Sequence, residues 1–186
     1  MPEGTIVFIV GATIVVIGLL AYIAMSMRRT QMLRARFGPE YDHLARTMGD
    51  KTRVEKELDE RQRRVSRLHI RPLEEHQLGR YRDSWRSVQT QFVDDPRRAV
   101  AEADRLVQDL MNARGYPVGE FEQNAADISV DHPNVVMHYR AAHDVAGRSA
   151  AGQASTEDLR QALIHYRALF DDLLETREST VGRDKL

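Results

Sequence analysis

The sequence predicts an all-α protein with a single N-terminal transmembrane helix, a basic connector and a bundle of four to five amphipathic helices. In the soluble part, apolar residues recur at intervals of three and four, which places them on one face of a helix. No segment of the sequence has the polar–apolar alternation that is typical of strands. Aromatic residues make up only 6% of the chain, which favours an aliphatic helical core over an aromatic-rich sheet.

Residues 1–29 are predicted to anchor the chain in a membrane. The stretch from Thr5 to Met27 contains 23 residues without a charge. At about 1.5 Å per residue this stretch can cross a hydrocarbon core about 30 Å thick. A signal peptide usually has basic residues before a shorter apolar run, whereas here Glu3 precedes the run and the basic residues follow it. We therefore favour an uncleaved anchor; the alternative is secretion after cleavage near Ser26.

The charges after the apolar stretch predict its orientation. Four arginines come before the next acidic residue in the chain, and they are Arg28, Arg29, Arg34 and Arg36. Because basic residues flank the cytoplasmic ends of membrane helices, we expect a single-pass protein of the bacterial plasma membrane, with its N-terminus outside and its C-terminal domain in the cytoplasm. The arginines would also lie against anionic headgroups, so the lipid bilayer is an expected partner.

Three glycines recur every seven residues within or beside the apolar stretch, at Gly4, Gly11 and Gly18. Small residues on one face let two membrane helices approach closely, so one interpretation is a homo-oligomer that forms through these glycines. The other interpretation is that membrane helices are rich in glycine whatever their contacts.

Residues 30–71 are expected to form basic juxtamembrane and stalk helices. Pro39 and Gly49 are placed where a short helix would begin and end. In the next predicted helix, residues 50–70, apolar residues follow a heptad pattern in which Arg61 occupies one core position. This helix is either a coiled-coil stalk or a solvated helix that packs on one narrow face.

Residues 72–175 are expected to form the helical bundle. The first helix has an apolar stripe at 3-4-3-4 spacing that includes the only tryptophan, Trp85, which is therefore predicted to lie in the core. Asp95 and Pro96 provide an N-cap and a first-turn proline for the second helix.

The rest of the bundle is less regular. The segment 115–133 is rich in turn formers and is expected to be a loop with one short helix at 120–126. Asp131 is expected to cap the following helix. Within residues 155–158, Ser155 and Asp158 approximate a capping box before the final helix. The polar tail, residues 176–186, is expected to be disordered.

Five segments of the sequence are distinctive: LRARFGPEYDHL (33–44), FVDDP (92–96), ARGYPV (113–118), FEQNAADISVDHP (121–133) and STEDLRQALIHYRALFDDLL (155–174). Together they resemble a family of uncharacterised bacterial proteins, labelled hypothetical, membrane or secreted, that have one N-terminal hydrophobic segment and a helical domain. The resemblance covers most of residues 33–174. It implies a membrane-anchored helical protein and carries no activity with it.

The sequence contains none of the glycine-rich phosphate motifs, zinc-protease motifs, calcium loops or nucleophile elbows of familiar enzymes. It has no cysteine, which excludes disulfides and thiolate metal sites. We therefore predict no enzyme activity, no cofactor and no metal. Nucleic acid is not an expected partner either. Residues 28–71 contain 13 Lys and Arg against 7 Asp and Glu, but residues 72–186 contain 14 against 20 and would repel phosphates.

The tetrapeptide HYRA occurs twice. Helical geometry puts each tyrosine at the centre of its helix's apolar stripe, each histidine at one border and each arginine at the other, with a solvated guanidinium. The six residues are His138, Tyr139, Arg140, His165, Tyr166 and Arg167. The simplest interpretation is two matched helices that pack together. The alternatives are a metal ion held by both histidines, with Asp131 or Asp144, and a pH-sensitive histidine pair.

Two functions are compatible with the sequence. The first is a protein-interaction or scaffold module at the inner face of a bacterial membrane, with an unidentified protein partner. The second is a ligand- or pH-sensing protein, rather than an enzyme, with a pocket under the 115–133 loop. The residues assigned to such an interaction or ligand site are Asp131, His132, His138 and His165.

Overall fold

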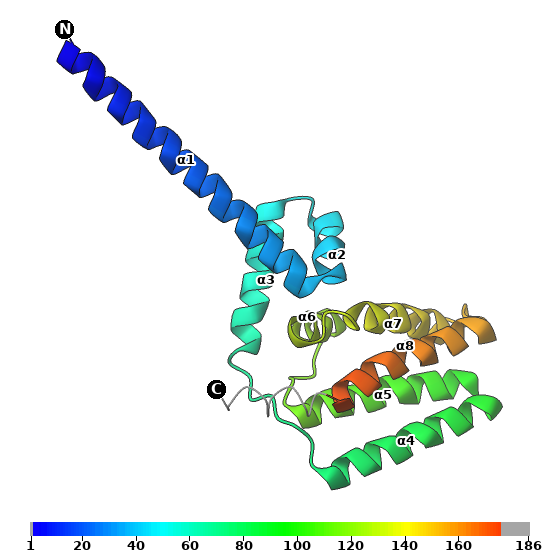
Figure 1. Ribbon diagram of the computed structural model, residues 1–186. Coiled ribbons are helices and arrows are strands. Elements are labelled where there is room, and N and C mark those ends of the chain that lie inside the picture. The colour runs from blue at the N-terminus through cyan, green and yellow to red at the C-terminus, as the bar shows by residue number, and fades with distance from the viewer. Residues whose placement is uncertain (1, 176–186) are drawn as a thin grey trace.

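The computed structural model describes residues 2–175, and all its regular structure in that range is helical, as the sequence predicts. The predicted tail, residues 176–186, lies outside the described residues. The helices are α1 (Pro2–Phe37), α2 (Pro39–Met48), α3 (Lys51–Val65), α4 (Glu75–Asp94), α5 (Pro96–Arg114), α6 (Phe121–Asp131), α7 (Val136–Ala150) and α8 (Thr156–Glu175). In Figure 1, α1 projects from the molecule, α2 and α3 pack beside its C-terminal end, and α4 to α8 form the remainder.

The larger hydrophobic core lies among α4, α5, α7 and α8, with contributions from α6 and the connecting segments. Trp85 is buried there and stacks on Phe170 with ring centroids 4.7 Å apart. Tyr139 and Tyr166 have no exposed surface, and their rings meet edge to face at 6.4 Å. The prediction that Trp85 and both repeat tyrosines are core residues is therefore confirmed, and the HYRA repeat joins α7 to α8.

A second, smaller core joins the end of α1 to α2, α3 and α6. Its buried residues are Leu33, Phe37, Tyr41, Leu44, Val54, Leu58, Val65 and Val130. The apolar heptad positions of α3 are thus buried against helices of its own chain. In the described part of the chain α3 is a packed helix of this core, and it does not stand apart as a stalk.

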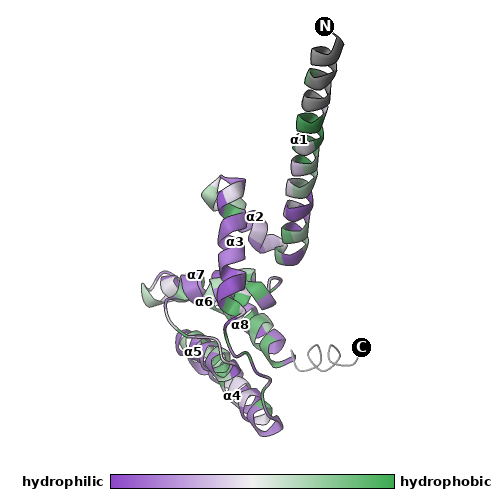
Figure 2. Ribbon diagram, turned by 90° about the vertical axis from the view of Figure 1, so that its left-hand side faces the viewer, coloured by the Kyte–Doolittle hydropathy of each residue, from purple (hydrophilic) through white to green (hydrophobic). Residues whose placement is uncertain are grey.

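Helix α1 continues without a break through residue 29, where the sequence suggested the end of the anchor. Its 36 residues correspond to a length of about 54 Å. The first part carries exposed apolar side chains such as Leu20, whereas Leu33 and Phe37 near the end are buried. Figure 2 shows this hydrophobic stretch extending away from the other helices. Within residues 2–175, α1 is the one helix long and apolar enough to span a membrane, although a signal sequence has the same character.

Helix α6 differs from the prediction. It extends from Phe121 to Asp131, because continuing the helix buries Ile128 in the larger core and Val130 in the smaller one. Asp131 is consequently the last residue of α6, and the prediction that it caps the next helix is wrong, since α7 begins only at Val136.

Candidate functional site

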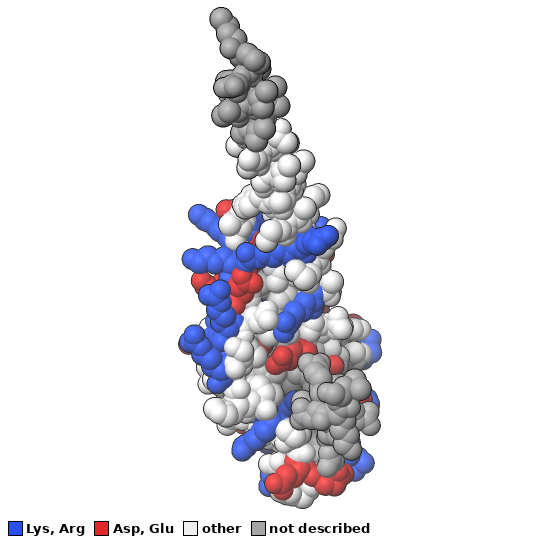
Figure 3. Space-filling view, turned by 60° about the vertical axis from the view of Figure 1, so that its left-hand side comes forward, with Lys and Arg blue, Asp and Glu red and all other residues white. Residues whose placement is uncertain are grey.

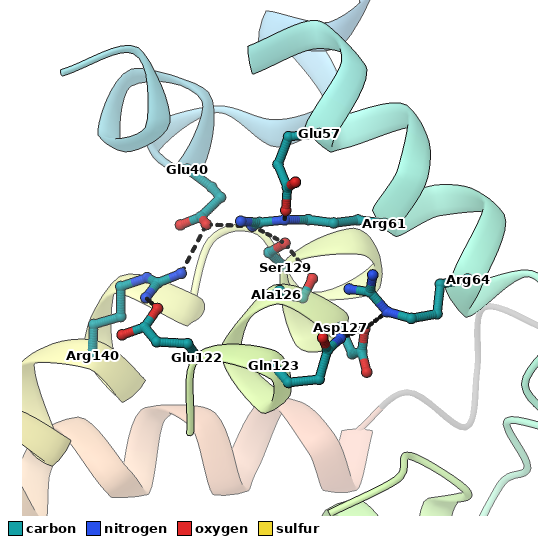
Figure 4. Close-up of polar contacts among 10 residues, drawn as sticks. All are labelled: Glu40, Glu57, Arg61, Arg64, Glu122, Gln123, Ala126, Asp127, Ser129 and Arg140. Carbon is teal, nitrogen blue, oxygen red and sulfur yellow. Dashed lines mark hydrogen bonds and ion pairs between the residues drawn. The ribbon is translucent and has the colours of Figure 1, made fainter. Parts of the chain in front are cut away.

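Four helices from both cores converge on a set of charged side chains that we call the polar junction (Figure 4). Its members are Glu40 on α2, Glu57, Arg61 and Arg64 on α3, Glu122 and Asp127 on α6, and Arg140 on α7. Of these, Glu40, Arg61 and Asp127 are buried. An isolated buried charge strongly destabilises a fold, so the contribution of the junction to stability depends on which partner each of these charges has.

Glu40 lies at the centre of the junction and its side chain has no exposed surface. It is in the first turn of α2, after Pro39, where a carboxylate interacts favourably with the helix dipole. Its Oε1 accepts hydrogen bonds from Arg61 Nη1 at 2.7 Å and from Arg140 Nη2 at 3.0 Å. One carboxylate oxygen therefore connects α2 to both α3 and α7.

The two arginines extend this connection. Arg61 also donates from Nε to Glu57 at 2.8 Å, and Arg140 donates from Nη1 to Glu122 at 2.7 Å. Burial lowers the pKa of Arg140, but the hydrogen bonds of Glu40 and Glu122 outweigh it and raise the pKa above its ordinary value. The result is an alternating series of three carboxylates and two guanidinium groups across α3, α2, α7 and α6.

A second ion pair lies beside the first series. Arg64 Nε donates to the fully buried carboxylate of Asp127 at 2.7 Å, and Gln123 Nε2 donates to the same oxygen at 2.9 Å. This pair joins α3 directly to α6. Together the two sets of contacts join α2 and α3, which pack on the end of α1, to α6 and α7.

An open cleft of about 720 Å³ borders the junction between α2, the start of α6 and α7. Its lining residues are His43, Thr47, Glu120, Phe121, Glu122, Arg140, His143 and Asp144. The ring of His143 stacks on Phe121 with centroids 3.6 Å apart. Three buried polar atoms in or beside the cleft have no hydrogen-bond partner among the described residues: Glu40 Oε2, Arg140 Nε and His143 Nδ1. Among the lining residues, exposed Thr47, Glu122 and Asp144 offer a donor and acceptors to a small polar molecule.

The residues that the sequence assigned to a site occupy two other places. Asp131 is exposed and accepts a hydrogen bond from Tyr116 Oη at 2.8 Å. His132 is buried, and its Nδ1 contacts the carboxylate of Asp172 on α8. Burial, followed by the charge of Asp131, raises the pKa of Tyr116. The Tyr116–Asp131 and His132–Asp172 contacts connect the segment after α5 and the end of α6 to α8. Neither contact lines the cleft.

His138 and His165 do meet across the seam of α7 and α8. Their Nδ1 atoms are 2.9 Å apart, so one ring donates and the other accepts. Burial, then the proximity of His138, lowers the pKa of His165. Within residues 2–175 no group of three His, Asp or Glu side chains is arranged to hold a metal ion. No hydrogen bond or ion pair in that range joins this pair to Asp131 or His132.

Sequence reasoning missed most of the polar junction. Arg61 gave a signal, since a charged residue at a heptad core position must find a buried partner or distort the seam. Glu40 gave none, because an acidic residue in a first helical turn is ordinary. Arg140 was expected at a solvated border, which is wrong: its side chain is only 13% exposed, because Glu40 and Glu122 hold it.

Comparison of the chain with protein families, with curated proteins and with solved structures finds no match.

Proposed function

We propose that this chain is a single-pass membrane protein that holds a helical bundle at the inner face of a bacterial membrane, as a scaffold for a protein partner. One observation carries the proposal: α1 exposes its apolar part and buries its last turns in a folded core. Leu20 is 60% exposed and Phe37 is 0% exposed on the same continuous helix. A contiguous apolar surface of this kind supports placement in a bilayer.

The orientation follows from the basic residues on the folded side of α1, which favour the cytoplasm. The polar junction supports a scaffold role. Because Glu40 connects the core that contains the end of α1 to α7 of the bundle, the bundle has a defined position relative to the anchor.

Cysteine labelling tests anchoring and orientation together, since the natural chain has no cysteine. We expect a Val93→Cys variant, at an 83% exposed position on α4, to react with a membrane-impermeant maleimide only after cells are lysed. A Glu3→Cys variant should react in intact spheroplasts. Both should remain in the membrane fraction after an alkaline wash. Labelling of Val93→Cys in intact spheroplasts would place the bundle outside, and recovery of a shortened soluble chain would support cleavage near Ser26.

The scaffold role is tested by photo-crosslinking in cells from an amber-encoded probe at Ile164, an apolar side chain on α8 that is 47% exposed. We expect one recurring protein partner at this position and none from a probe at exposed Leu20, on the face of α1 away from the glycines. The same set of weak products from both positions would argue against a specific scaffold surface.

A second candidate function is ligand sensing, and it is favoured by the cleft with its three unpartnered buried atoms. The cleft lies at the start of α6, and its lining includes Glu122 and Arg140 of the polar junction. A polar ligand in the cleft would contact Arg140 and so alter its hydrogen bond to Glu40. A His143→Phe variant keeps the ring stack on Phe121 and removes the imidazole, so a polar metabolite that stabilises the natural protein against heat should lose its effect in this variant.

A further inference from the structure

A second cleft, of about 590 Å³, lies where α1 passes the start of α3. Its wall on α1 comprises Tyr22, Met25, Ser26, Arg28, Arg29 and Met32, and its wall on α3 comprises Lys51, Thr52 and Glu55. The cleft therefore contains an apolar section and a charged section. The apolar section follows the exposed surface of α1 and the charged section faces the first turn of α3.

The charged section has an excess of positive charge. Arg28, Arg29 and Lys51 face Glu55 in the lining, and Arg29 Nη2 also donates to Asp59 on α3 just outside it, so the cations outnumber the carboxylates by one. Glu55 accepts a hydrogen bond from Thr30 at 2.7 Å and lies 3.8 Å from both Arg29 Nε and Lys51 Nζ. It holds these two cations beside each other while about half of each side chain stays exposed, 51% for Arg29 and 50% for Lys51.

Arg28 is different, because it forms no ion pair with any residue in the described part of the chain. Its guanidinium is free to bind an anion from outside the protein. Figure 3 shows Lys and Arg side chains gathered at the base of the uncharged part of α1. An anion that enters the cleft meets two guanidinium groups and one ammonium group, which suits a phosphate.

The apolar section selects the kind of phosphate compound. Tyr22 and Met25 are 71% and 72% exposed and belong to the uncharged stretch that ends at Met27. A hydrocarbon chain can lie along them while its headgroup reaches Arg28. A free phosphate or a nucleotide would leave this apolar wall uncovered, so the arrangement fits a molecule with a charged head and an apolar tail.

We propose that this cleft binds an anionic phospholipid of the inner leaflet, with its phosphate between Arg28, Arg29 and Lys51 and an acyl chain along Tyr22 and Met25. The inference rests on the membrane anchoring and orientation proposed above. It adds a lipid of defined charge that occupies a specific place between the anchor and the small core, where it would hold the start of α3 against α1.

Native mass spectrometry of the full-length protein tests this inference. The protein is extracted in mild detergent and exposed to equal amounts of phosphatidylglycerol and phosphatidylcholine. We expect retained phosphatidylglycerol to predominate, and an Arg28→Gln, Lys51→Gln double variant to lose this preference by about fivefold for each charge removed. Added glycerol phosphate, which has the headgroup chemistry without the acyl chains, should not displace the lipid.

The matched control is an Arg53→Gln, Lys56→Gln double variant. It removes two exposed charges from the same helix outside the cleft lining, and should keep the preference. Equal loss in both variants would reduce the effect to general attraction between basic residues and acidic lipids and would overturn the inference. So would equal retention of the two lipids, or displacement by glycerol phosphate. Loss of the protein from the membrane fraction would instead count against the proposed anchoring, so the two failures are distinguishable.

Discussion

Glu40 illustrates how one side chain determines the relation between the two halves of the molecule. Its carboxylate has no exposed surface and accepts from arginines on two different helices. An apolar residue at position 40 would fill similar space but would leave Arg61 with only Glu57 and Ser129, and Arg140 with only Glu122. A buried ion pair of this type adds little net stability. Removal of one partner alone is nevertheless costly, because the other charge is then buried without a partner.

We therefore predict that Glu40→Ala lowers the free energy of unfolding by roughly 3–5 kcal/mol, because two largely buried guanidinium groups lose their shared acceptor. Urea unfolding of the full-length protein in detergent, followed by circular dichroism, measures this change. The control is Glu60→Ala, which breaks an exposed pair with Lys56 and should cost about 1 kcal/mol or less. Similar losses in the two variants would show that Glu40 contributes nothing beyond a surface charge.

His165 predicts a pH dependence. Burial and then His138 hold its pKa in the folded protein below the ordinary value of 6.5. The unfolded chain then takes up a proton at a higher pH than the folded protein does, so stability is full above about pH 6.5 and declines as the pH falls below it. His165→Gln should make unfolding midpoints change less steeply between pH 7 and pH 5. His76→Gln, at an exposed site on α4, should retain the natural slope. If the unfolding midpoints of the natural protein and both variants change equally with pH, His165 is not the source of the pH dependence.

The helices themselves were largely predictable, because their start signals are local. Asp50 accepts from Thr52 N at 2.8 Å and Asp95 from Arg98 N at 3.1 Å, as caps do. Ser155 Oγ accepts from Asp158 N at 3.1 Å while Asp158 Oδ2 accepts from Ser155 N at 2.9 Å, so the predicted capping box is complete. The extent of α6 was not predictable, since tertiary burial of Ile128 and Val130 decides where it ends.

The glycine stripe of α1 carries an element-level prediction. A Cβ added at Gly18 meets no atom within 4 Å, so the monomer does not need a glycine there. We expect Gly11→Leu, Gly18→Leu to abolish self-association in a membrane two-hybrid assay while the soluble helices remain folded, because bulky side chains separate the two helix backbones. Ala12→Leu, Leu19→Ala, which changes side-chain size at positions next to the stripe, should leave association intact. Undiminished association of the glycine variant would remove the stripe from consideration.

At the scale of the molecule, residues 2–175 form two cores that charged side chains join, and only part of this arrangement was predictable from the sequence. Each core follows from apolar stripes that are legible in the sequence, such as Tyr139 and Tyr166 for the larger one. The partner of each charge was hidden, because Glu40 and Arg140 are 100 residues apart and neither departs from what its own helix favours. For the same reason nothing in the sequence pointed to His43 or His143 as lining residues of the cleft beside them.

The division of α1 between an exposed and a buried part leads to a prediction about truncation. A chain that starts at Met27 keeps Leu33 and Phe37, so it should be soluble, highly helical and cooperative in thermal unfolding. A chain that starts at Gly38 lacks both side chains and should lose the smaller core, since such deletions each cost about 2–5 kcal/mol. Circular dichroism and size-exclusion chromatography compare the two. Aggregation of the longer chain would mean that the fold itself needs the apolar part of α1.

The uninterrupted course of α1 into the smaller core gives the molecule the geometry of a lever. If α1 spans the bilayer as proposed, any tilt of the membrane segment turns the small core with it, and the polar junction passes that rotation to the bundle. A tilt of about 20°, usual for membrane helices, displaces a point about 30 Å from the pivot by about 10 Å. Bilayer thickness would then set how far the bundle leans toward the membrane surface, and with it which face of the bundle is presented to the cytoplasm.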